Sequence, residues 1–228
     1  MPITRRAAIA AFVIFAAFAM HNLNAGYFEP RVLGFVDPRV DYANLDKLAN
    51  ALGSAPWTLS GLGHFVSGFA MVYLALCARE MFREHKLVPA RVALVAGVIG
   101  AVGFLMTGIS DLVGGGLFKS PFAAATLLAG QNPDVARAVY AAQALPRITY
   151  NALAQVGLGW YAVLVSWCGL KTGLMGRGLG WFGYFSGFCG LLMGLMFVPL
   201  YMYTVLVWSL WYGVFLWRRP APALGRSA

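Results

Sequence analysis

Charged residues are scarce in this sequence. Asp, Glu, Lys and Arg make up only 11% of its 228 residues, whereas soluble domains carry about 25%. So few charges cannot cover a water-facing surface, and a soluble globular domain is therefore excluded. Hydrophobic residues make up 60% of the chain and its mean hydropathy is +0.70, which is typical of an integral membrane protein.

Cysteine is also scarce. The three cysteines, Cys77, Cys168 and Cys189, lie in or at the ends of apolar segments and form no C-x-x-C pair. This arrangement excludes a disulfide framework. It is typical of cysteines that serve as small buried hydrophobic side chains.

The motifs of several large enzyme classes are missing. The chain contains no G-x-S-x-G, H-E-x-x-H or Walker-type loop, each of which places a nucleophile, a metal or a phosphate. Its three histidines are too few for the membrane di-iron hydroxylases, which need many histidine ligands. The sequence therefore favours a non-enzymatic role.

The formal net charge of +9 does not indicate a nucleic-acid partner. Nucleic-acid binding needs Lys and Arg gathered on one face or stripe. Here the cationic residues flank long apolar runs, as the positive-inside rule predicts for membrane proteins. We expect membrane lipids, and not nucleic acid, as partners.

The apolar runs predict an all-α fold, a polytopic transmembrane helix bundle of about six spans that forms one membrane domain over residues 1–228. Runs of ~20 apolar residues are long enough to cross a bilayer. The predicted spans cover residues 7–24, 58–77, 91–113, 146–169, 178–197 and 200–217.

Two of these assignments have alternatives. The first run follows Arg5 and Arg6 and could belong to a cleaved signal peptide, but the sequence after it, at 20–24, is a poor cleavage site. The last run covers about 40 residues and would be ~60 Å long as one helix, twice the hydrocarbon core. Pro199 at its middle favours two spans. Five spans, with one long kinked helix, remain the alternative.

Segments 25–57 and 114–145 separate the spans on one side, and we expect short interfacial helices in them. An amphipathic pattern predicts one helix over residues 41–52. Two Ser-Pro or Asn-Pro pairs resemble helix starts with proline in the first turn. They predict helices over residues 122–129 and 134–144.

The distribution of charge predicts the orientation. With both termini in the cytoplasm, the inner segments hold eleven of the 17 Lys and Arg residues but only two of the eight Asp and Glu residues. This excess matches the positive-inside rule. We therefore expect an inner-membrane protein whose two long segments, 25–57 and 114–145, face outward.

Segments 178–184 and 208–213 are rich in glycine and aromatic residues. In these segments the chain resembles six-helix membrane proteins of bacteria. The resemblance covers the last fifth of the chain, and it implies neither an activity nor any site residue.

Glycines recur on one face of the fifth predicted span, at Gly183, Gly187, Gly190 and Gly194. Small residues at steps of three and four allow the backbones of neighbouring helices to approach closely. We expect this face to pack against another helix of the same chain. An interface with another membrane subunit is the alternative.

Five polar residues on four spans fall at a similar depth in the outer leaflet: His21, His64, Asp111, Tyr150 and Asn151. Ionisable residues are costly inside a membrane and often mark a functional site. These five are therefore the candidate site, although they match no known metal-binding motif.

Four interpretations of this layer are open. The two histidines could bind a b-type haem between them, or His21, His64 and Asp111 could bind a metal ion. Alternatively, the histidines could form hydrogen bonds with Asp111, Asn22 and Asn151 that only hold the helices together. A pocket for a ligand or a lipid head group would use the same residues.

The leading hypothesis is a non-enzymatic accessory subunit, or a binder of a lipid-like ligand at the outer leaflet. The first alternative is a haem- or metal-binding redox protein that uses His21 and His64. The second is a small transporter. Other membrane-protein subunits are the expected protein partners.

Overall fold

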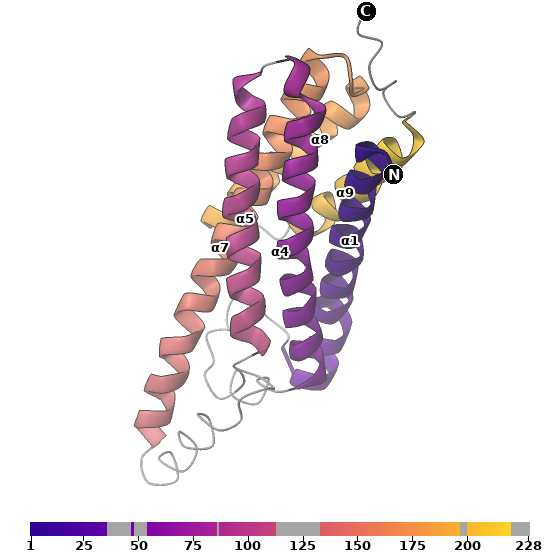
Figure 1. Ribbon diagram of the computed structural model, residues 1–228. Coiled ribbons are helices and arrows are strands. Elements are labelled where there is room, and N and C mark those ends of the chain that lie inside the picture. The colour runs from indigo at the N-terminus through magenta and orange to yellow at the C-terminus, as the bar shows by residue number, and fades with distance from the viewer. Residues whose placement is uncertain (36–46, 48–53, 86, 113–132, 197–199, 220–228) are drawn as a thin grey trace, which may run out of the picture.

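The computed structural model describes residues 1–35, 47, 54–85, 87–112, 133–196 and 200–219 (Figure 1). This part of the chain is helical and contains no strand. Its main helices are α1 (Ile3–Leu23), α4 (Ala55–Met81), α5 (Val88–Leu112), α7 (Pro133–Lys171), α8 (Arg177–Met196) and α9 (Leu200–Arg218).

Six helical segments of the described residues are long and apolar enough to cross a membrane. The prediction of an all-α bundle with six spans is therefore confirmed. The last apolar run forms two helices, α8 and α9, and not one long helix. The turn predicted between them lies at 197–199, outside the described residues.

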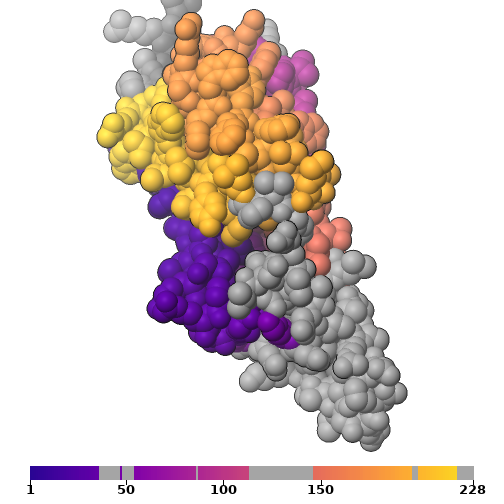
Figure 2. Space-filling view, turned by 180° about the vertical axis from the view of Figure 1, so that it is seen from behind, coloured from indigo at the N-terminus to yellow at the C-terminus, as the bar shows by residue number. Residues whose placement is uncertain are grey.

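The helices pack in chain order, and the ring closes because α1 contacts α9 as well as α4. The N-terminus, the connection between α4 and α5, and the end of α9 lie at the same end of the bundle (Figure 1). Viewed from behind, α8 and α9 cover this end, and α1 extends past them toward the other (Figure 2). We call the end with the termini the terminal end and the opposite one the far end.

Glycine brings successive helices into backbone contact. A Cβ on Gly157 of α7 would overlap the backbone of Gly100 in α5. A Cβ on Gly187 of α8 would lie 2.5 Å from the carbonyl oxygen of Gly159 in α7. The glycine face predicted on α8 thus lies against helices of the same chain, with Gly183, Gly187, Gly190 and Gly194 each close to α7 or α9.

Aromatic side chains fill the interior of the ring. Tyr161, Tyr201 and Trp208 are fully buried, and Trp208 stacks on Tyr212 with ring centroids 5.1 Å apart. The Tyr161 hydroxyl donates to the carbonyl oxygen of Leu74, which links α7 to α4. These aromatics of α9 therefore serve as core packing, while others of the same helix, such as Tyr203 and Trp211, are exposed.

The first helix is longer than predicted. After Leu23 the chain continues as a π-helix, η1 (Asn24–Leu33), and this helix ends at Gly34, whose φ of 68° is left-handed. A side-chain hydrogen bond spans one turn of the π-helix, because Asn24 Nδ2 donates to Glu29 Oε1, five residues along, at 3.2 Å. The first helical stretch thus runs past residue 24, where the predicted span ends, to Leu33.

The fourth span begins at Pro146 as predicted, but the helix that contains it, α7, begins earlier, at Pro133. Residues 134–144 do not form a separate short helix but the first turns of α7, which continues through Pro146 to Lys171. The predicted start at the Asn-Pro pair is correct, because α7 begins at Pro133. The helices predicted over 41–52 and 122–129 lie outside the described residues.

Candidate functional site

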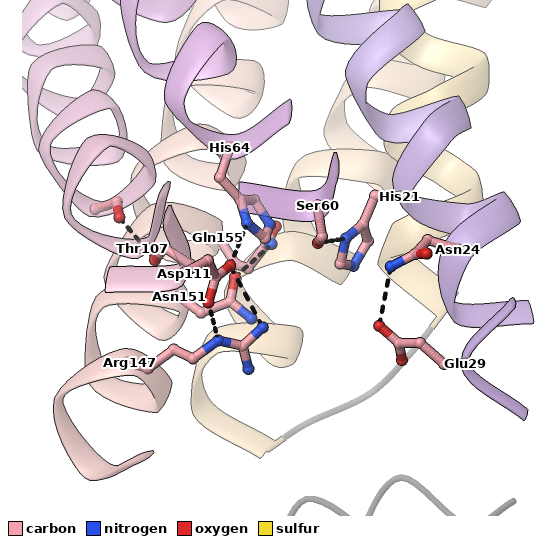
Figure 3. A network of polar contacts seen from close by, with 11 residues as sticks. His21, Asn24, Glu29, Ser60, His64, Thr107, Asp111, Arg147, Asn151 and Gln155 are labelled. Atoms are coloured by element: carbon pink, nitrogen blue, oxygen red, sulfur yellow. Dashed lines mark hydrogen bonds and ion pairs between the residues drawn. The ribbon is translucent and has the colours of Figure 1, made fainter. Parts of the chain in front are cut away.

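Polar side chains from α1, α4, α5 and α7 meet toward the far end of the bundle (Figure 3). They lie at the level where α8 ends and α9 begins. A Cβ on Gly194 of α8 would lie 2.9 Å from the carbonyl oxygen of Ala152, and Asn22 Nδ2 donates to the carbonyl oxygen of Met202 in α9 at 3.0 Å. We call this set the polar layer: His21, Asn24, Ser60, His64, Asp111, Arg147, Asn151 and Gln155.

Asp111 is the centre of the charged part of the layer. Its carboxylate is fully buried and accepts hydrogen bonds from Arg147 Nε and, at 3.3 Å, from His64 Nδ1. The guanidinium of Arg147 also lies 4.1 Å from the centre of the Trp57 ring. A buried carboxylate is tolerated only where it is paired and hydrogen-bonded, and these contacts meet that need.

The two histidines lie in direct contact. Their ring centroids are 5.0 Å apart and the rings are inclined by 51°. His21 Nδ1 bonds with the Ser60 hydroxyl at 2.9 Å, and the His64 ring stacks on Phe104. Ser60 lies one helical turn before His64. The helix α4 therefore supplies a hydrogen-bond partner to His21 through Ser60 and to Asp111 through His64.

The helix α7 contributes a polar stripe. Arg147, Asn151 and Gln155 follow one another at steps of four, which places them on one face. Gln155 Nε2 donates to Asn151 Oδ1 at 3.1 Å. Gln155 Oε1 is buried and has no hydrogen-bond partner among the described residues.

The side-chain oxygen of Asn24 also lacks a hydrogen-bond partner among the described residues. Asn24 uses its Nδ2 for Glu29 in η1, and its Oδ1 is buried without a partner in the part of the chain that the structure describes. A buried acceptor that accepts nothing costs free energy. Both amide oxygens can therefore accept a hydrogen bond from a donor outside the described residues.

The structure brings together most of the residues predicted as a site. His21, His64 and Asp111 converge, and Asn151 belongs to the same layer through Gln155. No hydrogen bond within the described residues joins Tyr150 to them.

Four members of the polar layer were not predicted: Asn24, Ser60, Arg147 and Gln155. The steps of four between Arg147, Asn151 and Gln155 were a signal in the sequence. Ser60 carried a weaker one, because it precedes His64 by four residues.

Other polar atoms are buried away from this layer. Ser166 Oγ and Trp208 Nε1 both lie beside Gly183, and neither has a hydrogen-bond partner among the described residues. These two side chains lie between α7, α8 and α9 and carry no charge. Serine and tryptophan within an apolar span are typical of packing, so the sequence did not distinguish them.

Comparisons of the chain with protein-family models, curated proteins and solved structures found no match.

The layer does not fit a haem between its histidines. Two axial histidines must face each other across the plane of the porphyrin, whereas these two rings touch. Among the described residues there is also no group of three or more His, Cys, Asp or Glu side chains that could hold a metal ion. The geometry thus favours neither the haem nor the metal interpretation.

Proposed function

We propose that this protein is a non-enzymatic integral membrane protein that binds a lipid-like molecule, with the head group of that molecule held by the polar layer. One observation carries the proposal: ionisable side chains from α1, α4, α5 and α7 converge within an otherwise apolar bundle. Ligand sites are typically apolar surroundings with a few convergent polar groups. Ionisable groups within spans usually mark such sites.

Close contacts between the helices also form away from the layer. The contacts of α5 with α7 and of α7 with α8 already form through glycines, with backbone against backbone. In membranes this close packing is a main source of helix association. A fully buried carboxylate and two histidines in contact add a cost to that packing, and a bound ligand offers a reason for it.

The position of the layer suits a molecule that is partly lipid and partly polar. The layer lies toward one end of the spans, where α8 ends and α9 begins. The apolar side chains of α4 on either side of it, including Leu59, Leu62 and Val66, are exposed and would face lipid tails. The charge distribution supports an outward position for this end, with both termini in the cytoplasm of a cell that has an inner membrane.

Native mass spectrometry of the purified protein tests the proposal. We expect the wild type to retain a lipid-like molecule at one per chain, and the His21→Phe/His64→Phe variant to lose it. The third histidine supplies a matched control, because His85 lies in the turn between α4 and α5 at the terminal end. His85→Phe should retain the molecule. If all three proteins carry the same bound molecules, the polar layer does not bind them.

A further inference from the structure

We infer that the head group bound at the polar layer is neutral and carries a hydroxyl group, as in a diacylglycerol. This inference rests on the proposed function and adds the class of ligand. It follows from two features of the layer: the way its charges are paired, and the kind of hydrogen-bonding atom that lacks a partner.

The charges of the layer cancel within the protein. Arg147 and His64 both donate to Asp111, and the carboxylate has no exposed surface. A phosphate would have to draw Arg147 away from Asp111, and the carboxylate would then be buried beside a second negative charge. A cationic head group would have to compete with Arg147 and His64 for the same two oxygens. A neutral head group disturbs neither contact.

The buried side-chain atoms of the polar layer that lack a hydrogen-bond partner among the described residues are acceptors. Gln155 Oε1 and Asn24 Oδ1 are buried and accept no hydrogen bond among the described residues. Exchanging the nitrogen and oxygen positions of the Gln155 amide alone would not give its oxygen a donor, because that oxygen would then face Asn151 Oδ1. A hydroxyl group donates to such an oxygen. A ketone, ester or quinone head group offers only acceptors and can donate to neither oxygen, whereas a single hydroxyl can donate to one of them.

A hydroxyl also suits the histidines. Each imidazole uses Nδ1 for a protein partner, His21 for Ser60 and His64 for Asp111. A neutral imidazole has one nitrogen that donates and one that accepts. A hydroxyl, which both donates and accepts, can therefore bond with the Nε2 atom of either ring whichever tautomer that ring adopts.

Photo-crosslinking in phosphatidylcholine liposomes tests this inference. Two probes with the same diazirine-labelled acyl chains are compared: a diacylglycerol and the corresponding phosphatidic acid. We expect the diacylglycerol probe to label α4 or α7 near the layer, within residues 57–64 or 147–155, more strongly than the phosphatidic acid probe. Stronger labelling of these peptides by phosphatidic acid would overturn the neutral head group and leave the proposed function standing. Labelling by neither probe would overturn both.

Competition isolates the hydroxyl group. Dioleoylglycerol and triolein carry the same acyl chains, but triolein has no hydroxyl. We expect dioleoylglycerol to displace the diacylglycerol probe at a concentration about tenfold lower than triolein, which corresponds to one buried hydrogen bond. Equal displacement by the two would overturn the role of the hydroxyl.

Discussion

Asp111 of α5 and Arg147 of α7 form an ion pair at the far end of two helices that touch through Gly100 and Gly157. The close backbone contact fixes the spacing of the two helices. The ion pair then has little freedom to separate, and Asp111 is left without access to solvent. The glycine contact between α5 and α7 and the ion pair between Asp111 and Arg147 therefore depend on each other at this interface.

Removing one partner of this pair should be more harmful than removing both. We expect Arg147→Met to lower the free energy of unfolding by about 3–5 kcal/mol, because it leaves a buried carboxylate uncompensated. The Asp111→Asn/Arg147→Met variant should recover part of that loss. Denaturation of the purified proteins in detergent measures both effects. Additive losses would show that the two side chains do not interact.

Close backbone contact makes Gly157 intolerant of even a methyl group. We expect Gly157→Ala to lower the free energy of unfolding by about 1–3 kcal/mol or more, because its Cβ would overlap Gly100 and lie 2.9 Å from the carbonyl oxygen of Ala96. Gly176→Ala is the control, since no atom lies within 4 Å of a Cβ there. The yield of folded protein and its thermal stability in detergent report the difference. Equal stability of the two variants would contradict the packing of α5 against α7.

The proposed orientation can be tested with an impermeant thiol reagent in intact cells. The background is a variant in which alanine replaces Cys77, Cys168 and Cys189, all of which are buried. A cysteine at the exposed Tyr27 of η1 should react, whereas a cysteine at the exposed Glu84 should react only after the cells are permeabilised. Reaction at Glu84 in intact cells would reverse the orientation.

The contact between the two imidazole rings predicts that His21 and His64 do not share a haem. The purified protein should show no Soret band that depends on either histidine, and elemental analysis should find no stoichiometric metal. A Soret band that disappears in His21→Ala or His64→Ala would mean that the rings separate to bind haem, and the redox function would then replace the one proposed.

The fold was largely predictable from the sequence because long apolar runs leave few alternatives in a membrane. The errors fell where local signals conflict with a continuing helix. Pro146 was expected to mark a helix start, but α7 passes through it. The residues after Asn24 include Gly26 and Pro30, yet they continue as a π-helix in which Asn24 and Glu29 are paired. Hydropathy predicts neither the continuation of α7 through Pro146 nor the π-helix that follows α1.

The site was predicted in part, for a different reason. Counting residues from the ends of the spans gives depth, so His21, His64 and Asp111 could be assigned to one layer. Depth does not show which face of each helix points inward. The partners of these residues, Ser60 and Arg147, depend on that rotation and therefore required the structure.

A cryo-electron microscopy map of the protein in nanodiscs of native lipid tests the central claim most directly. The account predicts density for a lipid head group within hydrogen-bonding distance of His21 or His64 in the polar layer, and continuous with acyl chains that leave the bundle. A map in which the side chains of this layer contact only one another and water would contradict it.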